Sequence, residues 1–246
     1  MKFRLFSLFA VGMVATGLLT TLAHADQTAE SATVKSTHDG VEKSTTIRYW
    51  LALPKSYAAD DQKQWPLLLF LHGSGERGNS LDVVKKHGPP KLVAAGKELP
   101  FVVVSPQCPA DARWNSAELA KLVEHLANTL RIDRRRLYVT GLSMGGSGTW
   151  SLLAEQPTLF AAAVPICGRG DAAAAEKIAQ TPVWAFVGDK DRAELVENNR
   201  ELAAALKKAG AKAELTVYPG IGHDSWTETY DNPKVYEWLL SHERAE

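Results

Sequence analysis

The sequence predicts an α/β fold with a mostly parallel sheet and helices on both faces. Three observations support this expectation: a β-hairpin pattern comes first, short apolar runs then alternate with helical patterns, and each run is bounded by glycine or proline. Continuous apolar runs are typical of parallel strands that are buried on both faces. Alternation of such strands with helices predicts a parallel sheet covered by helices on both sides.

The strands are predicted from turn residues and apolar runs. The hairpin is expected over residues 31–53, with Asp39-Gly40 at its turn and the β-rich segment 45–50 on its second arm. The later strands are expected at residues 67–71, 101–104, 137–139, 161–164, 183–187 and 214–218.

Helices are predicted where apolar residues recur at steps of three and four. One pattern covers residues 119–130, just before the strand at 137–139. A second covers residues 195–208 and ends in two lysines before Gly210, as expected of a helix C-terminus with a glycine cap. The last covers residues 233–241.

The first 25 residues are predicted to be a cleaved signal peptide. Lys2 and Arg4 precede an uncharged apolar run over residues 5–22, and Ala23-His24-Ala25 offers small residues around a cleavage site. A retained membrane anchor is the alternative, because the run nearly reaches the ~20 residues that span a bilayer. Cleavage after Ala25 leaves one domain over residues 26–246, without stable membrane insertion, and implies a secreted or periplasmic protein.

The charge balance argues against a nucleic-acid partner. The chain has 28 Lys+Arg and 28 Asp+Glu, so its formal net charge is zero. Nucleic-acid binders usually gather an excess of basic residues on one face, because phosphate neutralisation supplies much of their affinity. The triplet Arg134-Arg135-Arg136 is the main basic cluster, and we expect it to be a solvated turn beside a strand.

A serine flanked by glycines follows the strand predicted at residues 137–139. The segment Gly141-Leu142-Ser143-Met144-Gly145 has the G-x-S-x-G pattern of a nucleophile elbow. A tight strand-to-helix turn requires such small residues, and they let the serine hydroxyl protrude. The pattern is common by chance, but its position after a buried parallel strand predicts that Ser143 is a catalytic nucleophile.

A serine nucleophile needs a histidine base that is held by an acid. His223 follows the last predicted strand, so it is expected at the same sheet edge as Ser143. Asp191 follows the strand at 183–187 and is preferred as the acid over Asp189, which is expected to be a turn residue. We expect structural or solvated positions for the other histidines of the mature chain: His38, His72, His87, His125 and His242.

Two backbone N–H groups are expected to form an oxyanion hole, those of Met144 and Ser74. Ser74 lies in the glycine-rich loop 72–78, between His72 and the neighbours Glu76 and Arg77, which we expect to pair with each other. Such a loop can also cradle phosphate, but the P-loop lysine and a helix-opening G-x-G-x-x-G are missing. Nucleotide binding is therefore not expected, and the predicted serine mechanism needs no metal or cofactor.

From about residue 67 to residue 240, these motifs resemble those of the α/β-hydrolase superfamily. The chain order Ser143, Asp191, His223 is also the order of that superfamily. The segments 105–109, 165–168 and 223–226 (SPQCP, PICG and HDSW) resemble a narrower bacterial group. That group comprises phospholipase/carboxylesterase-like serine esterases, often labelled predicted peptidases, which are related to feruloyl and polyhydroxyalkanoate esterases. The resemblance implies an eight-stranded sheet in the order 1-2-4-3-5-6-7-8. Arg192 departs from the proline that relatives often carry after the acid.

Cys108 and Cys167 are the two cysteines of the chain. An oxidising compartment would allow a disulfide between them. In the implied sheet order, the strands that precede them end about three strand spacings of ~4.8 Å apart, which is too far for a disulfide. Two partly buried thiols are therefore favoured over a bridge.

The predicted function is hydrolysis of carboxylic esters through an acyl-enzyme. Only about fourteen residues separate Cys167 from Thr181, so no large cap domain is expected over the site. An open site suits short acyl or aromatic esters, either as small molecules or attached to a polymer. Trp114 and Trp226 are the expected aromatic substrate contacts, with ordinary packing as the alternative.

Two other functions remain open at this point. A serine peptidase or aminopeptidase would use the same three residues on the same fold. A noncatalytic binding module is disfavoured, because every position of the predicted triad is filled. The sequence does not indicate an oligomeric state.

Overall fold

The computed structural model describes residues 27–38 and 41–244. The predicted signal peptide over residues 1–25 and the hairpin turn Asp39-Gly40 lie outside this range. No helix in the described part of the chain is long and apolar enough to cross a membrane.

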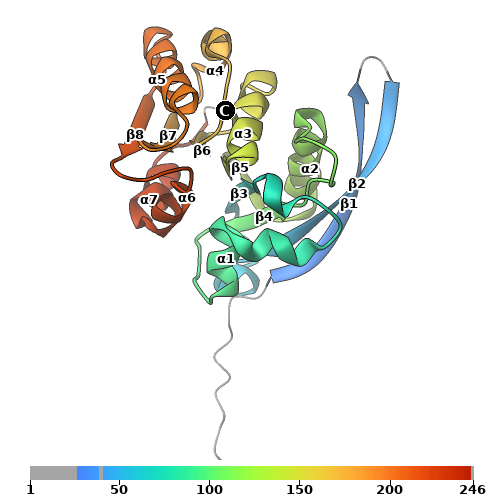
Figure 1. Ribbon diagram of the computed structural model, residues 1–246. Coiled ribbons are helices and arrows are strands. Elements are labelled where there is room, and N and C mark those ends of the chain that lie inside the picture. Colours follow the sequence, from blue (N-terminus) through green and yellow to red (C-terminus); the bar gives the residue numbers. More distant parts are fainter. Residues whose placement is uncertain (1–26, 39–40, 245–246) are drawn as a thin grey trace, which may run out of the picture.

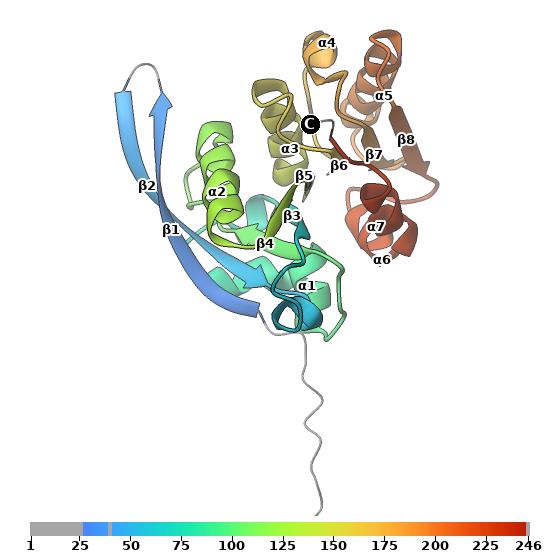
Figure 2. The same ribbon diagram turned by 180° about the vertical axis from the view of Figure 1, so that it is seen from behind.

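Eight strands form a single sheet in the order β1-β2-β4-β3-β5-β6-β7-β8, which confirms the order that the resemblance implied (Figures 1 and 2). β1 is antiparallel to β2 and β2 to β4, whereas all the remaining neighbours are parallel. The strands are β1 (Gln27–His38), β2 (Val41–Ala52), β3 (Trp65–Leu71), β4 (Val102–Pro106), β5 (Ile132–Leu142), β6 (Ala162–Ile166), β7 (Val183–Gly188) and β8 (Ala213–Tyr218).

Helices cover both faces of the sheet (Figures 1 and 2). One face carries α2 (Ser116–Thr129), α3 (Met144–Glu155), α4 (Ala175–Ile178) and α5 (Ala193–Lys208). The other face carries α1 (Gly88–Ala94), α6 (Trp226–Asp231) and α7 (Pro233–Leu240). No large cap domain covers the described part of the molecule, in agreement with the short segment between Cys167 and Thr181.

The central strand β3 shows how one apolar run builds two cores. Successive side chains of a strand point to opposite faces. Leu67, Leu69 and Leu71 therefore pack under α2 and α3, while Leu68 and Phe70 pack on the side of α1 and α7, and all five are fully buried. Each such side chain contributes roughly 1.5–3 kcal/mol of burial free energy.

The basic triplet lies within β5 rather than in a turn, so that expectation was wrong. Trp65 pairs with Ile132, but the next pair is Leu67 with Leu137, so the residues between them bulge out of the ladder. Arg134 and Arg135 of the triplet remain exposed. The bulge allows a polar segment to form part of a strand whose other end is buried.

The short helices α1 and α6 were not predicted. Helix α1 has seven residues and begins with Gly88-Pro89-Pro90, which is too short for an apolar period to be recognised. Helix α6 has six residues and starts at Trp226, directly after the loop that carries His223. Both helices pack on the face of the sheet opposite α3.

The carboxyl ends of the parallel strands meet at one edge of the sheet. Ser143 follows β5, Asp191 follows β7 and His223 follows β8, while the glycine-rich loop follows β3. Residues distant in sequence therefore converge at this edge.

Candidate active site

Ser143 occupies a sharp turn between β5 and α3. Its backbone has φ 54° and ψ −113°, a conformation that L-residues rarely adopt and that costs of order 1–3 kcal/mol. A Cβ atom on Gly145 would lie 1.9 Å from the Leu71 carbonyl oxygen, and one on Gly141 would lie 2.4 Å from the Gly145 oxygen. Only glycine allows this approach, so the sequence pattern and the strained turn have the same physical cause.

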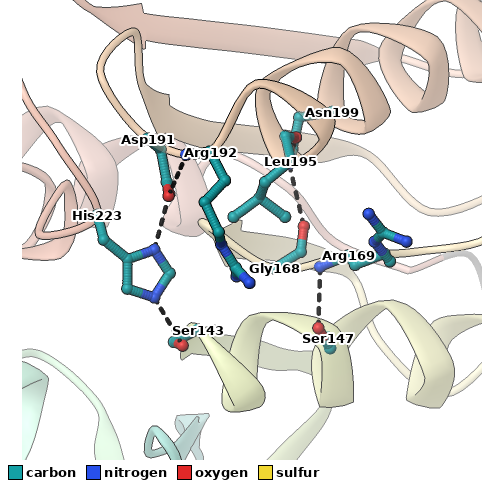
Figure 3. Close-up of polar contacts among 9 residues, drawn as sticks. All are labelled: Ser143, Ser147, Gly168, Arg169, Asp191, Arg192, Leu195, Asn199 and His223. Atoms are coloured by element: carbon teal, nitrogen blue, oxygen red, sulfur yellow. Dashed lines mark hydrogen bonds and ion pairs between the residues drawn. The ribbon is translucent and has the colours of Figure 1, made fainter.

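Three side chains form a continuous hydrogen-bond chain (Figure 3). The Ser143 hydroxyl lies 2.9 Å from His223 Nε2, and His223 Nδ1 lies 2.7 Å from Asp191 Oδ2. A carboxylate can only accept, so Nδ1 carries the proton and Nε2 is free to accept the hydroxyl hydrogen. Asp189 is not part of this chain, because its Oδ1 instead accepts the Gly220 N–H at 2.7 Å.

The loops that carry the acid and the histidine are tied together. Lys190 N–H donates to the Ile221 carbonyl at 2.9 Å, and a Cβ atom on Gly188 would lie 2.2 Å from that same oxygen. The Asp191 side chain is only 2% exposed, whereas that of His223 is 39% exposed. The acid is thus shielded from water and the imidazole remains accessible from outside.

The two expected oxyanion donors lie beside Ser143. Met144 begins α3 and Ser74 begins the 3-10 turn Ser74–Glu76, so their N–H groups have no acceptor within those helices. Both residues line the same cavity as Ser143, which has a volume of about 370 Å³. A larger cavity of about 650 Å³ is lined by residues between Pro157 and Arg244, and neither Ser143 nor His223 lines it.

The buried His72 side chain holds the glycine-rich loop in place. Its ring is fully buried, its Nδ1 lies 2.6 Å from the Gly73 carbonyl, and its Nε2 accepts the Cys108 N–H at 3.0 Å. Burial lowers the pKa of His72 to about 4, so the ring is neutral near pH 7 and its tautomer is fixed by the two contacts. His72 thus has a structural position, as expected, and it supports the loop that carries Ser74.

Glu76 and Arg77 do not pair with each other, which corrects the expectation. Arg77 Nε donates to the Ser74 carbonyl at 3.1 Å and its Nη1 to that of Ala112 at 3.2 Å. Glu76 is buried, with His87 Nε2 3.7 Å from its carboxylate. Arg77 therefore holds the exposed side of the loop through hydrogen bonds, whereas the Glu76 carboxylate is buried beside His87.

The two predicted aromatic contacts lie in different places. Trp226 packs edge-on against the His223 ring, with centroids 5.5 Å apart, and against His87 at 5.4 Å. Trp114 instead donates its indole N–H to the His72 carbonyl at 3.1 Å and lines a separate cavity of about 50 Å³. Of the two, Trp226 contacts the proposed base and Trp114 supports the loop.

Both cysteines are free and buried. Burial raises the pKa of Cys108 to about 11 and that of Cys167 to about 12. Cys167 also has a positive φ of 41° and lines the cavity beside Ser143. Such protonated thiols are poor nucleophiles.

Sequence reasoning missed the charged lining of the cavity. Arg113 and Arg169 join Arg77 and Arg192 there, and the four come from loops after four different strands, β3, β4, β6 and β7. No motif groups them, because only the sheet order brings these loops together. Within the described residues, no group of three or more His, Cys, Asp or Glu side chains could hold a metal ion.

The sequence is similar to that of a known enzyme family. Residues 110–238, just over half of the chain, match the model of the dienelactone hydrolase family. The putative carboxymethylenebutenolidase of Salmonella typhimurium strain LT2 is 37% identical over 101 residues, which are 37% of each chain. The chain thus matches well under half of that curated relative.

Solved structures share the fold. A thermostable esterase is 35% identical with a TM-score of 0.72, over 88% of this chain and 63% of that one. Dipeptidyl peptidase 4 of Porphyromonas gingivalis is 15% identical with a TM-score of 0.68, over 88% of this chain and 36% of that one, a likeness of fold alone. The α/β-hydrolase fold is therefore established, and the chain belongs to the dienelactone hydrolase family of enzymes.

Proposed function

We propose that the protein is a serine esterase in which Ser143, His223 and Asp191 form the catalytic triad. The observation that carries the proposal is the unbroken hydrogen-bond chain at 2.9 and 2.7 Å, which starts from a hydroxyl on a strained turn. Family membership and the 35% identical esterase support hydrolysis as the reaction.

The proposed reaction is acyl transfer to water. Ser143 Oγ attacks the ester carbonyl carbon while its proton passes to His223 Nε2, and Asp191 holds the resulting imidazolium. The N–H groups of Met144 and Ser74 bind the oxyanion, a contribution of typically ~3 kcal/mol per donor. His223 then protonates the departing alcohol, and a water molecule activated by His223 hydrolyses the acyl-enzyme.

The proposed substrates are esters of short acyl or aromatic acids, either small or linked to a polymer, because no large cap covers the described part of the site. We propose a site of action outside the cytoplasm, secreted or periplasmic, because residues 1–25 have the pattern of a signal peptide. A peptidase is the second candidate, since enzymes of that class share the fold.

The test is hydrolysis of p-nitrophenyl acetate, butyrate and decanoate, with methyl ferulate and an amino-acid p-nitroanilide alongside. Ser143→Ala is expected to lower kcat for the esters by about 10⁴-fold or more. Ser151→Ala, an exposed serine on the same helix α3, is the matched control and retains activity. Cleavage of the anilide in place of the esters would favour the peptidase, and ester cleavage unchanged in Ser143→Ala would overturn the mechanism.

A further inference from the structure

The segment SPQCP (residues 105–109) spans the end of β4 and the start of the loop that follows it. β3 and β4 are parallel neighbours, so this segment lies beside the glycine-rich loop that follows β3. The Gln107 side chain is buried, and its amide nitrogen donates to the Glu76 carbonyl at 3.0 Å and to the Ser80 carbonyl at 2.8 Å. One buried side chain thus holds the end of the glycine-rich loop at two points.

The backbone of the same segment makes further contacts with the loop. Cys108 N–H donates to His72 Nε2 at 3.0 Å, and the Cys108 carbonyl accepts the Gly78 N–H at 3.0 Å. Gly78 has φ 133°, a conformation that glycine adopts readily. The segment is itself fixed to β2, because Gln107 N–H donates to the Arg48 carbonyl at 2.9 Å. It therefore connects the sheet to the glycine-rich loop.

These contacts reach the proposed oxyanion donor, Ser74 N–H, by two routes, of which the first passes through His72. A carbonyl can only accept, so His72 Nδ1, which lies 2.6 Å from the Gly73 carbonyl, carries the proton, and Nε2 accepts the Cys108 N–H. The Gly73 carbonyl and the Ser74 N–H belong to one planar trans peptide and point in opposite directions. The hydrogen bond from His72 therefore fixes the direction of the Ser74 N–H.

The second route passes through the 3-10 turn Ser74–Glu76. The Glu76 N–H nitrogen lies 3.4 Å from the Gly73 carbonyl oxygen, which is longer than an ordinary N–H···O hydrogen bond. Because this internal bond is weak, the turn depends on partners outside itself to keep its shape. Gln107 supplies such a partner by donating to the Glu76 carbonyl at the end of the turn.

The precision of the oxyanion hole matters for the rate. Backbone donors stabilise the developing oxyanion because they are already oriented and need no rearrangement during the reaction. A misplacement of about 1 Å can lower the rate by about 10²-fold. Gln107 is not among the described residues that line the cavity around Ser143, so any effect it has on catalysis passes through the loop.

We propose that Gln107 is a positioning residue for the oxyanion hole. By holding the carbonyls of Glu76 and Ser80, it keeps the Ser74 N–H directed at the place where the oxyanion forms. This inference rests on the proposed esterase function, in which the Ser74 N–H binds the oxyanion. Gln107 thus stabilises the transition state and contributes little to binding of the ester itself.

The first test is Gln107→Met, which keeps the length of the side chain and removes both donors. We expect kcat for p-nitrophenyl butyrate to fall by at least about tenfold and KM to change by less than about threefold, because the oxyanion exists only in the transition state. Titration of Ser143 with a fluorophosphonate counts the active sites, so kcat is expressed per folded site. A wild-type kcat per site would overturn the inference.

Thr181→Val is the matched control. Thr181 is buried, and its Oγ1 donates to the Pro157 carbonyl at 3.1 Å, before β7 and thus at the opposite edge of the sheet from Ser143. This variant also loses a buried side-chain donor to a backbone carbonyl. Its Tm should fall, whereas its kcat per site should remain that of the wild type. An equal loss of kcat per site in Thr181→Val would overturn the positioning role.

A double-mutant cycle tests whether Gln107 acts through the Ser74 N–H. Ser74→Pro removes that N–H, and proline suits the first residue of a helical turn. Alone it should lower kcat by about 10²–10³-fold. Added to Ser74→Pro, Gln107→Met should lower kcat per site by less than about twofold more, because the donor that it positions is already gone. Losses that multiply in full would show that the two residues act independently and would overturn the inference.

The same variants separate this inference from the proposed function. Wild-type kcat in Ser74→Pro would show that the oxyanion hole itself is misassigned. Loss of activity in Ser74→Pro, with wild-type kcat per site in Gln107→Met, would overturn the inference alone. Should methionine prevent folding, Gln107→Asn keeps the amide but is one methylene shorter, and it should lower kcat per site by at least about threefold. Wild-type kcat per site in Gln107→Asn would equally overturn the inference.

Discussion

The Ser143 hydroxyl lies 2.9 Å from the His223 imidazole, although 80 residues separate them in the sequence. The contact exists because β5 and β8 end at the same edge of one sheet, with β6 and β7 between them. The geometry of the site is therefore a property of the sheet order. Substitutions of catalytic residues in the loops should lower the rate of hydrolysis, whereas substitutions of the elbow glycines should lower the stability of the fold.

The two aspartates of the acid loop provide a matched pair. Asp191→Asn should lower kcat for ester hydrolysis by about 10⁴-fold, because an amide can no longer hold His223 in the required tautomer. Asp189→Asn should retain activity, because asparagine can still accept the Gly220 N–H. The measurement is kcat on p-nitrophenyl butyrate for both variants, and equal losses would show that the acid has been misassigned.

The elbow should tolerate no side chain at Gly145. Gly145→Ala would place a Cβ atom 1.9 Å from the Leu71 carbonyl oxygen. We expect the free energy of unfolding to fall by about 3 kcal/mol or more, and Tm to fall by roughly 6 °C or more for a domain of this size. Gly75→Ala, with nothing within 4 Å of the added atom, should change Tm little. Thermal unfolding followed by circular dichroism checks both, and a Gly145→Ala protein as stable as the control would refute this packing.

Stability should depend on pH through His72. Its pKa falls from 6.5 to about 4 on folding because of burial, so the unfolded chain binds the proton more readily between these values. The stabilisation is fully present above pH 6.5 and is lost as the pH falls toward 4, by about 3 kcal/mol. Urea unfolding at several pH values measures this slope.

Variants test whether His72 causes this pH dependence of stability. His72→Gln should flatten the dependence between pH 6.5 and 4, because the titrating group is gone. His125→Gln should leave it unchanged, because His125 is exposed on α2. The His87 pKa is also lowered by burial, so part of the slope should survive in His72→Gln. An unaltered slope in His72→Gln would contradict the assignment.

The two thiols should be inert in the folded protein. Burial raises the pKa values of Cys108 and Cys167 to about 11 and about 12, so almost no thiolate is present at pH 8. Iodoacetamide at pH 8 should alkylate neither thiol and should leave esterase activity intact, whereas both should react in urea. Rapid alkylation of Cys167 with loss of activity would point to a thiol that takes part in the reaction.

Much of the fold could be predicted because local pattern and tertiary structure agree. The apolar run of β3 is buried on both faces, and the G-x-S-x-G spacing reflects the close approach of Gly145 to Leu71. The bulge of β5 could not be foreseen, because it depends on how Trp65 and Leu67 pair with their partner strand. The helices α1 and α6 are too short to show a period.

The candidate site could likewise be predicted only in part from the sequence. Ser143, Asp191 and His223 each follow a strand, so their meeting at one edge could be anticipated from the topology. The arginines of the cavity could not, because nothing in the sequence relates Arg113 to Arg169 or Arg192. The pairing of Glu76 with His87 was also missed, since it depends on the positions of the loop and of α1 after folding.

The decisive test of the proposed triad is covalent labelling by a fluorophosphonate, followed by intact-mass measurement and peptide mapping. Such reagents phosphonylate a serine hydroxyl that a neighbouring base activates. We predict a single adduct on Ser143, concurrent loss of ester hydrolysis, and no adduct on Ser143→Ala or on protein unfolded in urea. An unlabelled native protein that still hydrolyses esters, or an adduct on another residue that accompanies the loss of activity, would contradict the proposed triad.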